Sequence, residues 1–160
     1  MSKPGKSPSS SFVESRYLLM PDQANGHNTA FGGVIMAWID MVGAMAAQKH
    51  CKGAVVTASI DKLSFFSPIY VGEHVILKAM VNYVGKSSME VGVQVTKENP
   101  KTGVCARTTT AYLTFVQVDQ NGNPLQVPPL LVSSKEEIKR ESNAKLRVLS
   151  RKELLKKIKS

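Results

Sequence analysis

The chain has 160 residues, of which 42% are hydrophobic, so it is long enough for one domain with an ordinary core. Its formal net charge is +9, but residues 133–160 alone hold ten Lys/Arg and four Asp/Glu, leaving 11 basic and 8 acidic residues elsewhere. The basicity therefore belongs mainly to the C-terminal tail, which argues against nucleic-acid binding by the globular part.

The cysteines and the N-terminal sequence bear on the cellular compartment. Cys51 and Cys105 lie far apart and form no CxxC motif, so we expect no disulfide framework and a reducing, cytoplasmic location. The opening MSKPGKSPSSS contains no apolar run, so we expect no signal peptide. The three histidines form no HExxH motif or Cys/His cluster, and no metal site is expected.

In chain order, the first thirty residues predict one strand between two irregular segments. Residues 1–10 are rich in Ser, Pro, Gly and Lys and are expected to form a disordered tail. The segment SFVESRYLLM (11–20) predicts a strand, and PDQANGHNTA (21–30) predicts a loop because it is rich in turn-forming residues. Asn28 or Thr29 is a candidate N-cap for the helix that follows.

A long helix is predicted over residues 32–49. It is apolar on nearly every face, so we expect it to be enclosed. Asp40 lies in its middle, with no other charge within seven residues on either side. A membrane helix needs about 20 apolar residues, and a central acid would cost roughly 2.5–3.5 kcal/mol on insertion. We therefore expect no membrane insertion and a buried helix.

The remainder of the chain predicts four long strands and a charged tail. The strand segments are rich in β-branched residues, partly alternate in polarity and are joined by short turns: 54–66, 74–84, 88–98 and 104–119. Such strands pair antiparallel, so the predicted fold class is α+β, with one curved antiparallel sheet around the long helix. Residues 133–160 predict a basic extension, either helical or in equilibrium with disorder. This extension is either a solvated tail or a helix packed on a neighbouring subunit, or else a patch for nucleic acid or acidic membranes.

Asp40 is the first candidate for a catalytic residue. An isolated buried carboxylate costs many kcal/mol unless it is paired or hydrogen-bonded. Asp40 would therefore lie at an exposed helix edge, form a salt bridge that holds a dimer together, or act as a general base or nucleophile in a dry cleft. In such a cleft, the low dielectric raises the basicity of a carboxylate. The absence of neighbouring charges favours the cleft.

The FGG motif (31–33) stands at the expected start of the helix. Gly32 and Gly33 would let a ligand approach the backbone closely. The free N–H groups of the first turn would stabilise a developing oxyanion. A plain entry turn is the alternative interpretation.

The VGKSS motif (84–88) resembles part of a phosphate-binding loop. It lacks the first glycine and the strand-to-helix context of the Walker pattern, so we exclude a P-loop NTPase. A hairpin tip that carries Lys86, Ser87 and Ser88 would still contact a phosphate, and an ordinary polar turn is the alternative.

Four segments together resemble the hotdog-fold acyl-CoA thioesterases, in particular the bacterial acyl-CoA hydrolases and their two-domain animal relatives. The segments are MPDQANGHNTAFGGVIMAWIDMVGAMAA, VVTASIDKLSFFSPIYVGEHV, VGKSSMEVGVQV and TAYLTFVQVD. The similarity covers roughly residues 11–128, within a predicted domain of residues 11–132, and neither tail belongs to it. The resemblance implies a long central helix wrapped by the sheet, pairing of subunits, and assembly as a dimer or a trimer of dimers (a homohexamer).

By position, the resemblance implies a catalytic Asn25 and a catalytic Asp40, contributed to one site by opposite subunits. Asp40 would activate water or attack the thioester carbonyl itself, while Asn25 would place the water or the thioester. The N–H of Gly33 would stabilise the thioester oxygen, with Gly32 beside the substrate. Lys86, Ser87 and Ser88 would contact CoA phosphates. CoA is then part of the substrate and product, and no other cofactor is expected.

Three alternatives stay open at this point. The first is a protein that binds acyl-CoA or nucleotides without turnover. The second is a hydratase or dehydratase, for which His27 alone does not supply the usual His and acid. A nucleic-acid adaptor acting through the tail is the third. The acyl chain length is not fixed by the sequence, and Met36, Trp38 and Phe65 are candidate walls of an acyl tunnel. The reaction implied by the resemblance belongs to lipid metabolism.

Overall fold

The computed structural model describes residues 2–159. Its strands are β1 (Val13–Leu18), β2 (Val55–Ile60), β3 (His74–Val84), β4 (Ser88–Glu98) and β5 (Cys105–Gln117). The helices are α1 (Gly32–Cys51) and α2 (Lys135–Lys159), with the short 3-10 helices η1 (Pro8–Ser11) and η2 (Pro21–Gln23).

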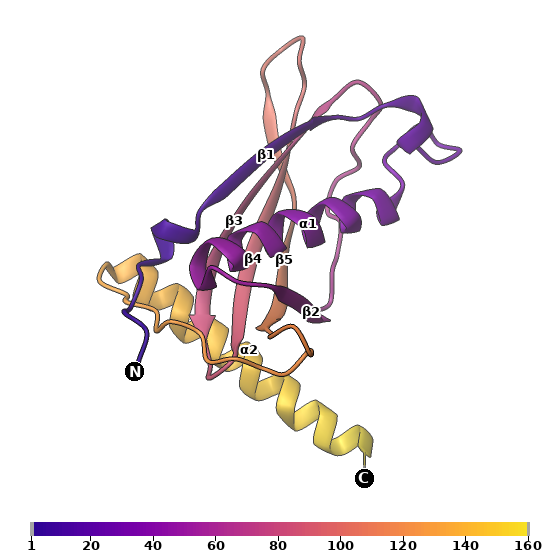
Figure 1. The fold of residues 1–160 in the computed structure, drawn as a ribbon. Helices are drawn as coiled ribbons and strands as arrows, with labels where there is room; N and C mark the ends of the chain where they lie inside the picture. The colour runs from indigo at the N-terminus through magenta and orange to yellow at the C-terminus, as the bar shows by residue number, and fades with distance from the viewer. Residues whose placement is uncertain (1, 160) are drawn as a thin grey trace.

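The five strands form one antiparallel sheet in the order β1-β3-β4-β5-β2 (Figure 1). Side chains alternate across its two faces, so that Met89, Val91, Leu113 and Phe115 are buried with α1, whereas Glu90 faces α2. The predicted α+β architecture of a long helix against a curved antiparallel sheet is therefore confirmed. The sheet separates the two long helices.

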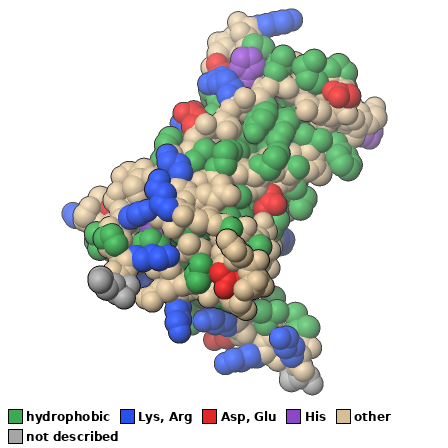
Figure 2. Space-filling model, in the orientation of Figure 1, with side chains coloured by type: hydrophobic (Ala, Val, Ile, Leu, Met, Phe, Trp, Pro, Cys, Tyr) green, Lys and Arg blue, Asp and Glu red, His purple; other side chains and the backbone are tan. Residues whose placement is uncertain are grey.

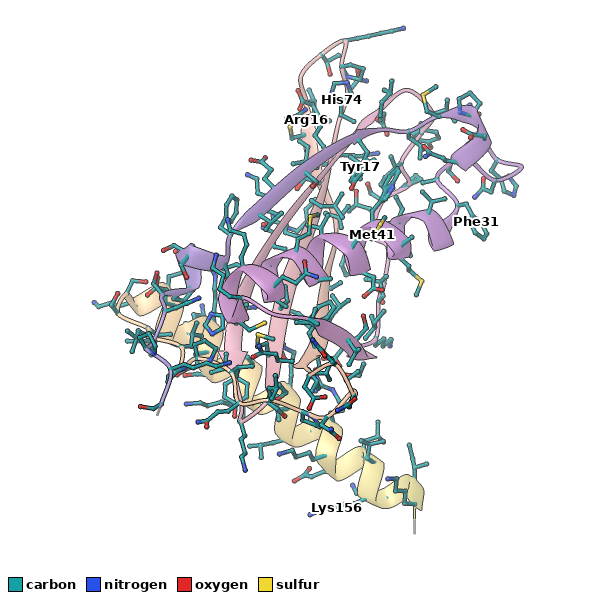
Figure 3. All side chains as sticks on the ribbon, in the orientation of Figure 1. Arg16, Tyr17, Phe31, Met41, His74 and Lys156 are labelled. Atoms are coloured by element: carbon teal, nitrogen blue, oxygen red, sulfur yellow. The ribbon has the colours of Figure 1, made fainter. Side chains whose placement is uncertain are left out.

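Helix α1 buries one face and exposes another. Ile35, Trp38, Ile39 and Val42 belong to the hydrophobic core. Met41 and Met45 lie on the opposite side and are exposed, and Met36 near the start of the helix is exposed as well, so the prediction of a fully enclosed helix is wrong for the single chain. Figure 2 shows apolar side chains gathered along this face, and Figure 3 shows Met41 pointing outward from the helix.

The predicted side-chain cap of α1 is also wrong. The N-cap residue is Phe31, and no side chain caps the helix. Asn28 instead adopts a left-handed conformation with φ of 62°. Thr29 pairs with Tyr70 in an isolated bridge, and the Ala30 N–H donates to the Ile69 carbonyl. These contacts hold the loop against residues 69 and 70. Its side chains therefore do not cap the first N–H groups of α1.

The structure differs from the expected disordered N-terminal tail. The backbone of Lys6 exchanges hydrogen bonds with Pro129 and Leu131, and its ammonium donates to the His50 carbonyl at the end of α1. The Ser11 hydroxyl, in η1, accepts from the Val81 N–H. Composition alone predicted disorder because these partners lie far away in the sequence.

Two further segments refine the predictions. Strand β2 ends at Ile60, well before the expected residue 66, and residues 61–69 run as an irregular segment joined to β5 by the hydrogen bond from the Phe66 N–H to the Thr108 carbonyl. Helix α2 is formed over 25 residues. Among the described residues, neither helix is long and apolar enough to span a bilayer.

Candidate active site

Asp40 lies in the third turn of α1, at the edge of the exposed methionine face. It is half-buried in the single chain, and its Oδ1 accepts a hydrogen bond of 2.7 Å from the Thr57 hydroxyl of β2. No ion pair to Asp40 is present within residues 2–159. The carboxylate is thus oriented by a neutral donor, which leaves its second oxygen available for chemistry.

Thr57 was missed by the sequence reasoning. Thr57 pairs in regular register with Phe115, which is buried on the α1 face of the sheet, so the Thr57 side chain lies on that face and reaches Asp40. Alternation could assign Thr57 to one face of a strand, but it could not show that this face meets Asp40, because the packing of β2 beside α1 is a long-range contact. The only available signal was a hydroxyl residue in a β-branched segment close to the helix that carries the acid.

Asn25 is held by its own loop with its amide nitrogen free. Its Oδ1 accepts hydrogen bonds from the His27 N–H, the Thr29 N–H and the Thr29 hydroxyl at 2.9, 3.3 and 3.1 Å. Because backbone N–H groups must meet the oxygen, these bonds fix the orientation of the amide. The Nδ2 group has no hydrogen-bond partner among the described residues, so it is available as a donor to a ligand.

Within one chain, Asn25 and Asp40 are not brought together. Asn25 lies in the loop ahead of α1, and Asp40 is eight residues beyond Gly32, which corresponds to about 12 Å along the helix axis. A site that uses both residues therefore needs a second copy of the chain. A site formed by one chain alone would use only one of the two.

Gly32 and Gly33 form the first turn of α1, as expected. A Cβ atom on Gly33 would lie 2.6 Å from the ring of Phe31, so only glycine fits there without movement of that ring. Phe31 itself projects from the start of the helix (Figure 3). The uncapped N–H groups of this turn carry the partial positive charge of a 20-residue helix.

The VGKSS segment forms the tip of the β3–β4 hairpin, where the Gly85 N–H donates to the Ser88 carbonyl at 2.8 Å. Lys86 and Ser88 line a cavity of about 250 Å³, whereas Ser87 does not. Arg151 and Lys152 of α2 line the same cavity. The sequence reasoning did not connect these two basic residues with the hairpin, because 66 residues separate Lys86 from Lys152.

A second cavity, of about 370 Å³, opens beside the start of α1. Its walls come from the Asn25 loop, the first turn of α1, the irregular segment 61–69 and β5: Thr29, Ala30, Gly32, Ile35, Phe65, Phe66, Ser67, Pro68, Ile69 and Thr108. Of the three candidate acyl-tunnel walls, Phe65 lines this cavity. Trp38 does not line it, because it stacks on Tyr17 at 4.3 Å, and Met36 is exposed and does not line it either.

Comparisons with known proteins show the family of this chain. Residues 27–104 match the family model of the thioesterase superfamily. The chain is 42% identical over 134 residues to the uncharacterized acyl-CoA thioester hydrolase YkhA of Bacillus subtilis, covering 84% of this chain and 78% of that protein. This chain belongs to the thioesterase superfamily. Within the superfamily, it is similar to the acyl-CoA hydrolases.

Solved structures show the same fold along nearly the whole chain. An acyl-CoA hydrolase from Staphylococcus aureus, in complex with butyryl-CoA, CoA and CoA disulfide, is 38% identical with a TM-score of 0.90, covering 98% of this chain and 95% of that one. An apo-hexameric acyl-CoA thioesterase is 37% identical with a TM-score of 0.92, covering 96% and 98%. The hotdog fold is thereby confirmed, and the similarity extends beyond the expected residues 11–128 into both tails.

Three variants of the Staphylococcus aureus hydrolase have also been solved, in which an Asn, an Asp or a Thr is replaced by Ala. In that enzyme, the Asn and the Asp are 15 positions apart, and the Asp and the Thr are 17 positions apart.

Proposed function

We propose that this protein hydrolyses acyl-CoA to a free acid and CoA, with Asp40 as the general base. The observation that carries the proposal is the hydrogen bond from Thr57 to Asp40 on an otherwise apolar face. Asn25, Asp40 and Thr57 are separated by 15 and 17 positions, the same spacing as the three residues replaced in the Staphylococcus aureus hydrolase. The family relationship supports the same reaction.

In the proposed reaction, the free oxygen of Asp40 takes a proton from a water molecule as the water oxygen attacks the thioester carbonyl. The Nδ2 group of Asn25 orients the substrate, and the N–H of Gly33 stabilises the negative charge on the carbonyl oxygen. The tetrahedral intermediate collapses as the C–S bond breaks, and Asp40 returns its proton to the CoA sulfur. Thr57 keeps the carboxylate in place throughout, because its hydroxyl donates to Oδ1 of Asp40 while Oδ2 accepts and releases the proton.

A second copy of the chain would complete the site by covering the methionine face of α1. Along α1 the single chain exposes four large apolar side chains, Phe31, Met36, Met41 and Met45, and such exposure is typical of a subunit interface. Covering it would remove Asp40 from water, which raises the basicity of a carboxylate. The second copy would also supply the Asn25 that one chain cannot bring to its own Asp40. The hexameric neighbour supports homo-oligomer formation, as a dimer or a trimer of dimers.

The hairpin tip is proposed to hold the nucleotide end of CoA through Lys86, Ser87 and Ser88. In the sheet, Ser88 pairs with Val116, and Val116 pairs with Val56, the neighbour of Thr57. Two strand spacings, about 10 Å, therefore separate the tip from the strand that orients Asp40. An extended CoA molecule can span that separation.

The direct test is CoA release from a panel of acyl-CoA substrates by the wild type and by Asp40→Asn. Removal of a general base should lower kcat by roughly 10²–10⁴-fold, with an unchanged thermal unfolding midpoint. Asp119→Asn, which alters an acid in a distant turn, is the matched control and should keep full activity. Equal release by the wild type and Asp40→Asn would refute the assigned role.

Mixing two inactive variants tests whether the site is shared between subunits. In a mixed dimer of Asn25→Ala and Asp40→Asn chains, one of the two shared sites keeps both native residues. Random reassociation should therefore restore about a quarter of the wild-type activity. If each chain used its own pair, the mixture would stay as inactive as its components.

The same assays separate hydrolysis from the alternative function, binding of acyl-CoA without turnover. Tight calorimetric binding of butyryl-CoA with no release of CoA by the wild type would favour the binding protein. The free Nδ2 group of Asn25 and the oriented carboxylate of Asp40 favour hydrolysis.

A further inference from the structure

Thr108 is a buried hydroxyl residue that a bulge turns toward the cavity at the start of α1. Thr109 pairs with Val95 and Arg107 pairs with Thr96, so Thr108 is the extra residue in β5. As a result, two consecutive threonines are both 0% exposed. A bulge of this kind redirects one side chain out of the normal alternation.

The two threonines differ in their hydrogen bonds. The Thr109 hydroxyl donates to the Ser64 carbonyl at 2.6 Å. The Thr108 hydroxyl, which lines the cavity, has no partner among the described residues. Ser67, from the irregular segment opposite, lines the same cavity, and its buried hydroxyl is likewise unpartnered among those residues.

The cavity therefore combines apolar walls with two kinds of hydrogen-bond donor, side-chain hydroxyls and backbone N–H groups. Phe65, Ile35 and Pro68 supply apolar surface, and Thr108 and Ser67 supply hydroxyl groups. Gly32 brings the uncapped start of α1, whose field favours a group with negative or partial negative charge. A purely hydrocarbon ligand would leave these donors unpaired, whereas an oxygen-bearing ligand would pair them.

We propose that this cavity binds the distal part of the acyl group and selects acyl chains that carry an oxygen, as a hydroxyl or a carboxylate, over hydrocarbon chains of equal length. The inference rests on the proposed hydrolysis of acyl-CoA. Thr29 and Ala30 in the cavity wall belong to the loop that Asn25 organises. An acyl chain that leaves a thioester beside Asn25 would therefore meet the cavity directly.

Discrimination of this type should differ in kind from that of an apolar pocket, which sorts acyl chains mainly by their length. A pocket that only fills space separates chains that differ by one methylene by about 10–200-fold and hardly rejects an added hydroxyl. A pocket with buried donors penalises the ligand that cannot pair them, by about 5- to 100-fold for one or two unpaired hydroxyls. Thr108 and Ser67 would then be specificity-determining residues.

The test compares kcat/KM for matched pairs of substrates: butyryl-CoA with 3-hydroxybutyryl-CoA, and pentanoyl-CoA with succinyl-CoA. The wild type should favour one or both oxygenated members. Thr108→Val, which removes the hydroxyl at nearly constant volume, should lower that preference by about tenfold, through KM more than kcat. Ser67→Ala should lower it in the same direction.

Thr110→Val is the matched control, because Thr110 lies on the same strand but lines a cavity on the other face of the sheet. It should leave the preference unchanged. The inference would be overturned if the wild type hydrolysed all chains without favouring oxygenated ones, or if Thr108→Val kept the wild-type preference. Either result would leave the hydrolase function intact.

Binding measurements keep the two proposals distinguishable. CoA thioethers that carry the same four chains cannot be hydrolysed, and calorimetry reports their affinities directly. If the wild type released no CoA from any substrate, the hydrolase function would fail. The selective cavity would still be supported if the wild type bound the oxygenated thioethers more tightly and Thr108→Val abolished this preference. Equal affinities of the wild type for all four thioethers would refute it.

Discussion

Helices α1 and α2 lie on opposite faces of one sheet and are attached to it by different forces. Helix α1 buries large apolar side chains such as Trp38, Ile39 and Val42. Helix α2 buries only Ala144, and its Arg147 donates two hydrogen bonds to Glu90 at 3.1 and 2.6 Å. Its outward residues include Leu149, and its C-terminal end, with Lys156, extends beyond the sheet (Figures 1 and 3).

This difference shows that a helix can be docked with its charged face inward. Arg151 holds Asp61 with two hydrogen bonds of 2.9 and 3.0 Å and donates a third to Thr114. Arg147 also lies 3.6 Å from the ring centroid of Tyr112. Such pairs depend on geometry more than on buried area, because desolvation of the charges offsets much of their attraction. The two helices should therefore respond differently to substitution.

Truncation in the core of α1 should have the larger effect. Ile39→Ala removes a side chain that is 1% exposed and leaves a cavity against the sheet, which should lower the free energy of unfolding by about 4 kcal/mol. Urea unfolding of the variant and the wild type measures the difference. Leu149→Ala, on the outward face of α2, is the control and should change the free energy by less than about 0.5 kcal/mol. Equal losses at the two positions would contradict the comparison.

Removal of one charge beneath α2 should have an intermediate effect. Arg147→Met leaves Glu90, whose side chain is 1% exposed, with only the more distant Arg151 at 3.8 Å. Burial already raises the pKa of Glu90 above its ordinary value despite the ion pair. We expect the free energy of unfolding to fall by about 2 kcal/mol, less than the roughly 3–5 kcal/mol of a fully buried pair, because Arg147 is partly solvated.

The double variant Glu90→Leu/Arg147→Met sharpens this prediction. If the single variant is unstable because it strands a buried carboxylate, removal of both charges should recover most of the loss. Chemical unfolding of the four proteins of the cycle gives the coupling free energy directly. A double variant no more stable than Arg147→Met would show that the helix is held by other contacts.

The elements and their order could be read from the sequence because periodicity encodes them locally. The strands at 74–84 and 88–98 have the predicted bounds, and α1 extends the predicted helix by two residues. Asp40 could be found because a lone acid in an apolar segment is conspicuous. Its role and that of Asn25 stay predictions until activity is measured.

The remaining features depend on long-range contacts that no local pattern contains. Thr108 reaches its position through a bulge in β5, which interrupts the alternation at that residue. Thr57 meets Asp40 only because β2 packs beside α1. Helix α2 directs Arg147 and Arg151 toward Glu90 and Asp61, and no local pattern in its own sequence indicates these distant partners. Lys6 contacts chain segments more than 40 residues away.

The smallest effect expected concerns His50, a titratable side chain that is fully buried near the end of α1. Its Nε2 donates to the Pro128 carbonyl at 2.8 Å, and its Nδ1 has no partner among the described residues. Burial lowers the pKa of His50 below its ordinary value of 6.5, and the positive charge of Lys6 acts in the same direction, while the bond to Pro128 opposes both. The folded protein therefore keeps this imidazole neutral under conditions in which the unfolded chain binds a proton.

Because the unfolded state binds more protons below about pH 6.5, the free energy of unfolding should decrease as the pH falls from 6.5 toward the lowered pKa of His50. His50→Gln keeps a donor for the Pro128 carbonyl but does not titrate, so it should flatten that decrease. His27→Gln, in the exposed loop, should leave it unchanged. Urea unfolding at a series of pH values separates these outcomes, and a wild-type slope that survives His50→Gln would assign the proton uptake to another group.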